Sequence, residues 1–184
     1  MNKLPDEHLI EAAIKRDDEA FIRLVSKYKH RVMSIAARFS QIREDLDDVC
    51  QEVFIKVYQN LRSYKKEVPF EHWLSRITVN TCYDALRKKK RQISGTSSVF
   101  SLKYDIADMS NEARQAAADA YHILYRGMSK LKASEQLVIT LLELEDRSIR
   151  EISDLTGWSE SKVKVRAFRA RKALKKFLEE IDHE

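Results

Sequence analysis

A strongly basic stretch, "SESKVKVRAFRARKALKK", covers residues 159–176. It contains eight Lys or Arg residues and a single acid. A helix with this composition can bind phosphate groups, and polar side chains near its start can reach base edges in the major groove of DNA. A helix end whose cations complement the helix dipole and stay solvated is the alternative. For a basic helix taken alone we favour that alternative, so the decision depends on the residues that precede it.

Those preceding residues have the spacing of a helix-turn-helix. Ser148 and Glu151 stand three positions apart, as in a capping box, and Gly157 follows where a left-handed helix end is expected. Ser159 can then cap a second helix. A short helix, a turn containing Gly and a second capped helix are typical of this DNA-binding motif. We therefore favour DNA contact over a solvated helix.

The apolar residues of the last helix divide it into two faces. Their spacing of three and four predicts a seam that packs on the core: Val163, Ala167, Ala170, Leu174, Phe177 and Leu178. The opposite face is predicted to meet DNA with Ser161, Lys162, Lys164, Val165, Arg166 and Arg169. Four later cations are predicted to bind phosphate: Arg171, Lys172, Lys175 and Lys176.

The first half of the chain has its own charged and aromatic groups. "ALRKKKR" is either a solvated helix end or a phosphate-binding edge, and the residues alone leave both open. Aromatic side chains beside cations can stack on unpaired bases. Tyr64 lies in a polar loop and is the better stacking candidate, whereas Trp73 is expected to pack in the core.

The elements that position these groups are predicted to be helices throughout. Apolar residues recur at steps of three and four from Leu9 onward, and Asp45 and Ser134 are plausible N-caps. A Ser-rich stretch without sustained periodicity separates two helical parts. The prediction is an all-α fold of two small helical domains, residues 1–92 and 111–184, joined by a flexible linker at 93–110.

Composition excludes several classes of protein. The 184 residues include three Gly and two Pro, with 43% apolar and 34% charged residues, which fits a helical protein rather than a turn-rich β protein. No apolar run approaches the roughly 18 residues of a membrane span, and the acidic N-terminus does not resemble a signal peptide. We therefore expect a cytoplasmic protein without direct membrane insertion.

Nothing in the sequence indicates catalysis. Cys50 and Cys82 are expected to be buried free thiols, and no His lies near a Cys at a metal-ligand spacing. No Gly-rich phosphate loop or paired nucleophile and base is present. We expect no enzyme activity, no metal and no cofactor.

Three stretches together resemble the extracytoplasmic-function (ECF) group of bacterial RNA polymerase sigma factors, within the sigma-70 family. They are "DLDDVCQEVFIKVYQNL", "FEHWLSRITVNTCYDALRKKKR" and "LKASEQLVITLLELEDRSIREISDLTGWSESKVKVRAFRARKAL". Their order and spacing are those of the family, and they cover most of the chain outside the linker.

This resemblance implies a factor that binds core RNA polymerase and directs it to promoter DNA. The first domain would recognise and open the minus-10 element, and the helix-turn-helix would read the minus-35 element. Asp48, Gln51, Glu52 and Lys56 would then dock the clamp helices of the largest polymerase subunit, and the polymerase flap is a second expected contact. The minus-10 residues would be Tyr64, Asn80, Asp84, Arg87 and Lys88, with residues 64–69 in the loop that accepts a flipped base. An anti-sigma factor is a further implied partner.

Two other functions remain as alternatives. A stand-alone helix-turn-helix regulator would explain the second domain but not the acidic and basic helices of the first. An adapter that only sequesters a regulator would not need cations on both DNA-facing helices.

Overall fold

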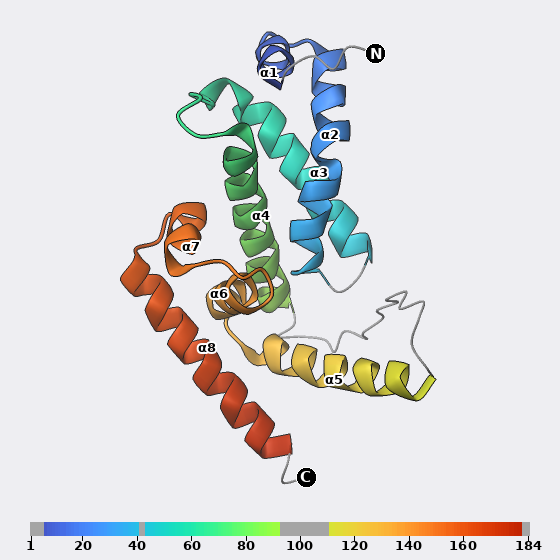
Figure 1. Cartoon of the computed structure of the whole chain (residues 1–184), viewed down its shortest axis with the longest axis vertical. Helices are drawn as coiled ribbons and strands as arrows, with labels where there is room; N and C mark the ends of the chain where they lie inside the picture. The colour runs from blue at the N-terminus through green and yellow to red at the C-terminus, as the bar shows by residue number, and fades with distance from the viewer. Residues whose placement is uncertain (1–5, 41–42, 93–110, 182–184) are drawn as a thin grey trace. The chain divides into compact units, whose positions relative to one another are not determined.

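The computed structural model describes residues 6–40, 43–92 and 111–181 of the chain. Every regular element in these ranges is helical, which confirms the predicted all-α fold (Figure 1). The chain forms two compact units, Met1–Ala85 and Leu86–Glu184, so the division falls inside a helix. The linker predicted at 93–110 lies outside the described residues, and the domain bounds stay a prediction.

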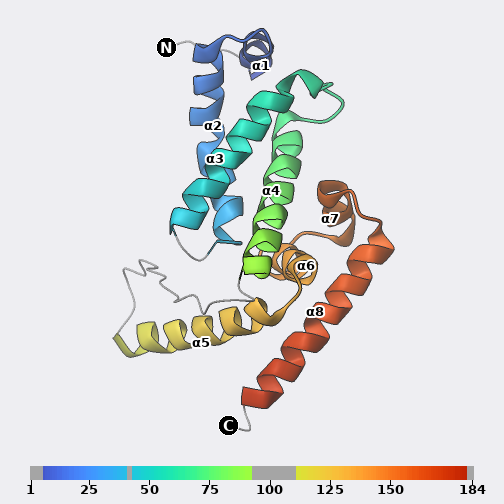
Figure 2. The same cartoon turned by 180° about the vertical axis from the view of Figure 1, so that it is seen from behind.

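In the first unit, two helices pack on a third, α2 (Asp18–Ala37). The elements of this unit are α1 (Asp6–Ile14), α2, α3 (Arg43–Asn60), a 3-10 turn (Leu61–Ser63) and α4 (Phe70–Gln92) as far as Ala85. Both α1 and α3 pack on α2 (Figure 2). The Asp17 carboxylate caps α2 by accepting from the Ala20 N–H at 3.0 Å. The prediction that Asp45 caps α3 is wrong, because α3 begins at Arg43 and Asp45 lies in its first turn, where an acid suits the helix dipole.

The apolar stripes of these helices are buried. Their most buried members come from α2, α3 and α4 and include Leu24, Val32, Val53, Val57 and Leu74. Cys50 and Cys82 are buried free thiols, as predicted.

Polar contacts fasten α1 to α2. The Tyr28 hydroxyl donates to the Asp6 carboxylate at 2.9 Å, and Lys27 forms an ion pair with the same carboxylate. The bond from Lys27, with help from Tyr28, lowers the pKa of Asp6. Burial and the bond to Asp6 raise the pKa of Tyr28. The start of α1 is thus held by one charged group that contacts two residues of α2.

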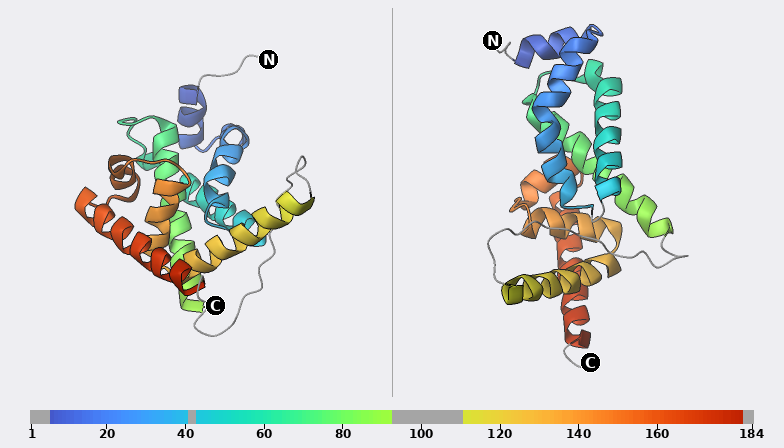
Figure 3. Two further views of the ribbon diagram at one scale, coloured as in Figure 1. Left: turned by 60° about the horizontal axis from the view of Figure 1, so that its bottom comes forward. Right: turned by 90° about the vertical axis from the view of Figure 1, so that its right-hand side faces the viewer.

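The second unit packs three helices against its longest one. Its elements are α5 (Asn111–Lys130), α6 (Ala133–Glu143), α7 (Ile149–Thr156) and α8 (Glu160–Ile181). All three preceding helices contact α8 (Figure 3). At Gly127 the approach of α5 to α8 is so close that a Cβ atom would lie 2.8 Å from the Phe177 ring.

Two predictions for this unit are wrong. Ser134 is not an N-cap, because α6 already begins at Ala133 and the Glu135 carboxylate accepts from the Lys132 N–H at 3.2 Å. Leu178 does not join the core, because its side chain is 49% exposed near the end of α8. The rest of the predicted seam is buried or half-buried.

No helix in the described ranges is both long enough and apolar enough to cross a membrane.

The contact between α1 and α2 predicts a pH-dependent effect of Asp6→Asn. The substitution should lower the free energy of unfolding at pH 7 by about 1 kcal/mol, because it removes a charged hydrogen-bond acceptor. The folded-state pKa of Asp6 is depressed, so its stabilisation is complete above the ordinary pKa of about 4 and is lost as the pH falls through the folded value. Urea unfolding of both proteins should therefore converge in strongly acidic solution. Glu19→Gln on the exposed surface of α2 is the control, and a difference that persists at low pH would contradict the assignment.

Candidate nucleic-acid interface

The helix-turn-helix predicted from sequence is present in the second unit. Ser148 caps α7: its hydroxyl accepts from the Glu151 N–H at 3.2 Å, and the Ser148 N–H donates to the Glu151 carboxylate at 2.9 Å. These bonds to Ser148 lower the pKa of Glu151. Gly157 ends α7 with φ +72°, a left-handed conformation that Gly adopts at no steric cost. The turn therefore delivers the chain directly into α8.

Most of the predicted reading residues are exposed on α8. Val163, Ala167 and Ala170 are no more than 2% exposed, which fixes the rotation of the helix. Five of the six predicted DNA-facing residues are exposed as a result: Ser161, Lys162, Lys164, Val165 and Arg169. Lys164 also lies 3.6 Å from Glu160 one turn earlier.

Arg166 differs from the other five because it is half-buried. Its guanidinium carbon lies 3.8 Å from the centre of the Trp158 ring, an arrangement that favours a cation–π interaction. One of its terminal nitrogens, Nη1, is buried and has no hydrogen-bond partner among the described residues. The side chain thus lies against the turn that precedes α8.

The later cations of α8 are mostly engaged in ion pairs. Arg171 binds the Glu143 carboxylate of α6 at 2.6 Å, whereas Lys175 and Lys176 each lie 3.7 Å from a Glu four residues later. Exposed pairs of this kind are weak, so the two lysines can exchange these partners for phosphate. Arg171 instead links two helices.

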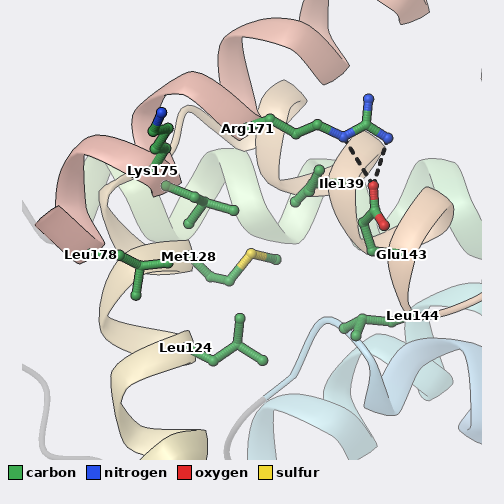
Figure 4. A pocket seen from close by; sticks show the side chains of 9 residues that line it. Leu124, Met128, Ile139, Glu143, Leu144, Arg171, Lys175 and Leu178 are labelled. Carbon is green, nitrogen blue, oxygen red and sulfur yellow. Dashed lines mark hydrogen bonds and ion pairs between the residues drawn. The ribbon is translucent and has the colours of Figure 1, made fainter.

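An apolar groove of about 410 Å³ lies between α5, α6 and α8 (Figure 4). Its lining is mainly aliphatic: Leu124, Met128, Ile139, Leu144, Leu174 and Leu178. The ion pair between Arg171 and Glu143 lies at one side of it, and Lys175 also contributes. Leu124 and Leu178 are 40% and 49% exposed, so the groove is an open apolar surface.

Helix α4, which the boundary between the two units crosses, presents four of the predicted minus-10 residues along one side. Asn80, Asp84, Arg87 and Lys88 are all exposed, and their spacing of four, three and one places them on one helical face. A cavity of about 380 Å³ opens beside Asn80 and is also lined by Trp73 and Arg76. Trp73 was expected to pack in the core, but it is only half-buried and lines the same cavity as the predicted minus-10 residue Asn80.

The fifth residue, Tyr64, is held inside an aromatic cluster. Its ring centre lies 5.4 Å from those of both Phe70 and Trp73, and its hydroxyl donates to the Val68 carbonyl at 2.8 Å. Burial raises the pKa of this hydroxyl. Tyr64 is half-buried and its hydroxyl closes the loop, whereas Trp73 lines the cavity beside Asn80.

The four predicted polymerase-docking residues differ in exposure. Asp48, Gln51 and Glu52 are exposed along α3. Lys56 is half-buried instead, and its Nζ atom lies 3.6 Å from Glu52 and 3.3 Å from Asp84 of α4. Lys56 thus connects the acidic face of α3 to the predicted minus-10 face of α4.

Comparison with known proteins accounts for both units. Residues 24–92 match the family model of sigma-70 region 2, and residues 121–174 match that of sigma-70 region 4. The chain belongs to the sigma-70 family.

Individual relatives place this sigma factor in the ECF group. It is 32% identical to the ECF RNA polymerase sigma-E factor of Escherichia coli strain K12, and the match covers 94% of this chain and 93% of the relative. The ECF RNA polymerase sigma-E factor of Haemophilus influenzae is 30% identical, with 94% of both chains covered. Among solved structures, CnrH in complex with the cytosolic domain of CnrY is 25% identical with a TM-score of 0.58, covering 95% of this chain and 97% of CnrH.

Two exposed apolar side chains of this sigma factor escaped the sequence prediction. Phe168 is 67% exposed on α8, one helical turn from Lys164 on the outward face, where a ring can contact a thymine methyl group. Ile55 is 42% exposed on α3, four residues after Gln51 on the acidic face. Periodicity could have found both, because neither falls on the buried seam of its helix.

The contact between Trp158 and Arg166 predicts energetic coupling. We expect Trp158→Leu and Arg166→Ala to be non-additive in the free energy of unfolding, with an interaction energy of about 1 kcal/mol. Denaturant unfolding of the two single variants and the double variant measures it. Arg169→Ala, paired with Trp158→Leu in the same way, is the matched control and should be additive. Additivity for Arg166 would show that the stacked arrangement adds no stability in solution.

Proposed function

We propose that this ECF sigma factor binds core RNA polymerase and directs it to promoters that carry matched minus-35 and minus-10 elements. In this proposal α8 enters the major groove of the minus-35 duplex, and α4 with the loop before it binds the separated minus-10 strand. The polymerase performs the catalysis, and the sigma factor contributes recognition and strand opening without a cofactor.

The observation that carries the proposal is the presence of both sigma regions in order on one chain. Region 2 at residues 24–92 and region 4 at residues 121–174 account for both helical units. A stand-alone helix-turn-helix regulator accounts only for the second. The exposed cations on α4 and α8 also favour DNA binding over an adapter that only sequesters a regulator.

Two surfaces are suited to the polymerase. Asp48, Gln51 and Glu52 give α3 an exposed acidic face with Ile55 among them, which suits a basic partner with an apolar contact at its centre. We propose that this face docks the clamp helices of the largest subunit. The groove between α5, α6 and α8 suits an amphipathic helix, and we assign it to the polymerase flap.

Control by an anti-sigma factor is part of the same proposal. The related CnrH is known in complex with the cytosolic domain of CnrY. A partner that covers the acidic face of α3 and the groove of the second unit would compete with core polymerase for both. The proposed location is the cytoplasm, where the polymerase works.

A run-off transcription assay tests the function directly. Purified core polymerase should produce discrete promoter-specific transcripts from a genomic fragment library only when this chain is added, because core polymerase alone does not select promoters. A folded chain that yields no such transcript in repeated libraries would refute the proposal.

Charge reversal on α3 tests the docking face. The double variant Asp48→Lys with Glu52→Lys should weaken binding to core polymerase at least tenfold, because it replaces attraction by repulsion at two positions. Fluorescence titration of labelled sigma factor with core polymerase measures this affinity. Glu19→Lys, which reverses an exposed acid on α2, should bind as the unmodified protein does. Equal affinity of all three proteins would remove Asp48 and Glu52 from the interface.

A further inference from the structure

A small pocket lies between α1 and the loop that joins α3 to α4. Its volume is about 300 Å³, the lower end of the range for small-molecule sites. Glu7 and Ile10 of α1 form one wall, and loop residues form the other: Tyr64, Lys66, Glu67, Val68 and Pro69. The match to sigma-70 region 2 begins at residue 24, so α1 is outside it.

Several side chains that line this pocket are held in position by burial and hydrogen bonding. Ile10 is only 3% exposed, and Tyr64 and Val68 are half-buried. The hydroxyl of Tyr64 donates to the Val68 carbonyl at 2.8 Å, which closes the loop on itself. Burial raises the pKa of that hydroxyl, and Glu7 and Lys66 line the same pocket.

A charged contact holds the loop against α1. Lys66 has φ +61°, a left-handed conformation that side chains other than Gly rarely adopt. Its Nζ atom lies 2.6 Å from the Glu11 carboxylate of α1, and this bond raises the pKa of Lys66. Because the local conformation is unfavourable, the contact with α1 helps to keep the loop in this shape.

The rim of the pocket carries hydrogen-bond acceptors. Glu7 and Glu67 are exposed carboxylates at its edge. A carboxylate accepts from the exocyclic amino group of cytosine or adenine, whereas thymine offers a carbonyl oxygen at the equivalent position. A base enters such a pocket most easily from a strand that is already separated.

We propose that α1 completes the pocket for the flipped minus-10 base, and that Glu7 selects a base with an exocyclic amino group, adenine or cytosine, over thymine. The proposal rests on the proposed promoter-opening function and adds a specificity determinant from α1. Glu11 positions the loop through Lys66.

The test uses core polymerase reconstituted with the full-length chain on promoters that are already unpaired across the minus-10 element. Each minus-10 position of the non-template strand is varied through the four bases, and open-complex affinity is measured. The unmodified chain should prefer adenine or cytosine over thymine at one position. Glu7→Gln keeps the size of the side chain but removes its charge, and should reduce that preference about fivefold, since one charged hydrogen bond is weakened. Glu19→Gln, the same change on α2, should leave the preference intact.

The results separate this proposal from the proposed function. If Glu7→Gln transcribes from the same promoters with an unchanged preference at every position, the role of Glu7 is refuted while the sigma function stands. If the unmodified chain supports no promoter-specific transcription, the function itself fails.

An exchange of charges tests the role of Glu11. Lys66→Glu alone should weaken the base preference, and adding Glu11→Lys should restore it, because the contact reforms with its charges reversed. Failure to recover would show that Lys66 acts on DNA directly and would overturn the positioning role of Glu11.

Discussion

The orientation of α8 depends on the burial of a narrow seam of small apolar residues. Val163, Ala167 and Ala170 are almost fully buried, and their short side chains allow the neighbouring helices to come close. Once this seam is packed, the rotation of the helix is set, and every outward side chain is presented in one fixed order. The same constraint operates on α3, where buried Val53 and Val57 leave the acids on the opposite side. Each recognition surface is therefore a consequence of how its helix is buried.

Sequence periodicity was sufficient to predict the helical fold and the helix-turn-helix. Helix seams repeat over many residues, so a single ambiguous position changes little. Helix ends depend on local competition between alternative caps, which explains the errors at Asp45 and Ser134. The exposure of Leu178 has another cause, because the last turns of α8 extend along an open groove rather than a closed core.

The contacts that the sequence could not reveal join residues far apart or on different elements. Lys56 and Asp84 are 28 positions apart, and only the packing of α3 near α4 brings them together. Arg166 stacks on Trp158, which directly follows the left-handed turn at Gly157. The sequence predicted this turn, but it did not predict the contact with Arg166. Tyr64 was chosen as a stacking residue because its loop is polar, but its ring packs on Phe70 and Trp73. Charge and polarity in the sequence therefore indicate which helix faces are exposed, but they do not predict which side chains on those faces contact one another.

The unequal burial of the outward residues of α8 bears on how such a protein can diverge after gene duplication. Ser161, Lys162 and Val165 project from the helix and contribute little to the core, so a copy can change them and retain its fold. Arg166 is tied to Trp158, so a change at one alters the surroundings of the other. Under the proposed role of α8, new promoter preferences are thus most accessible at Ser161, Lys162 and Val165, while Arg166 and Trp158 change only through paired substitutions.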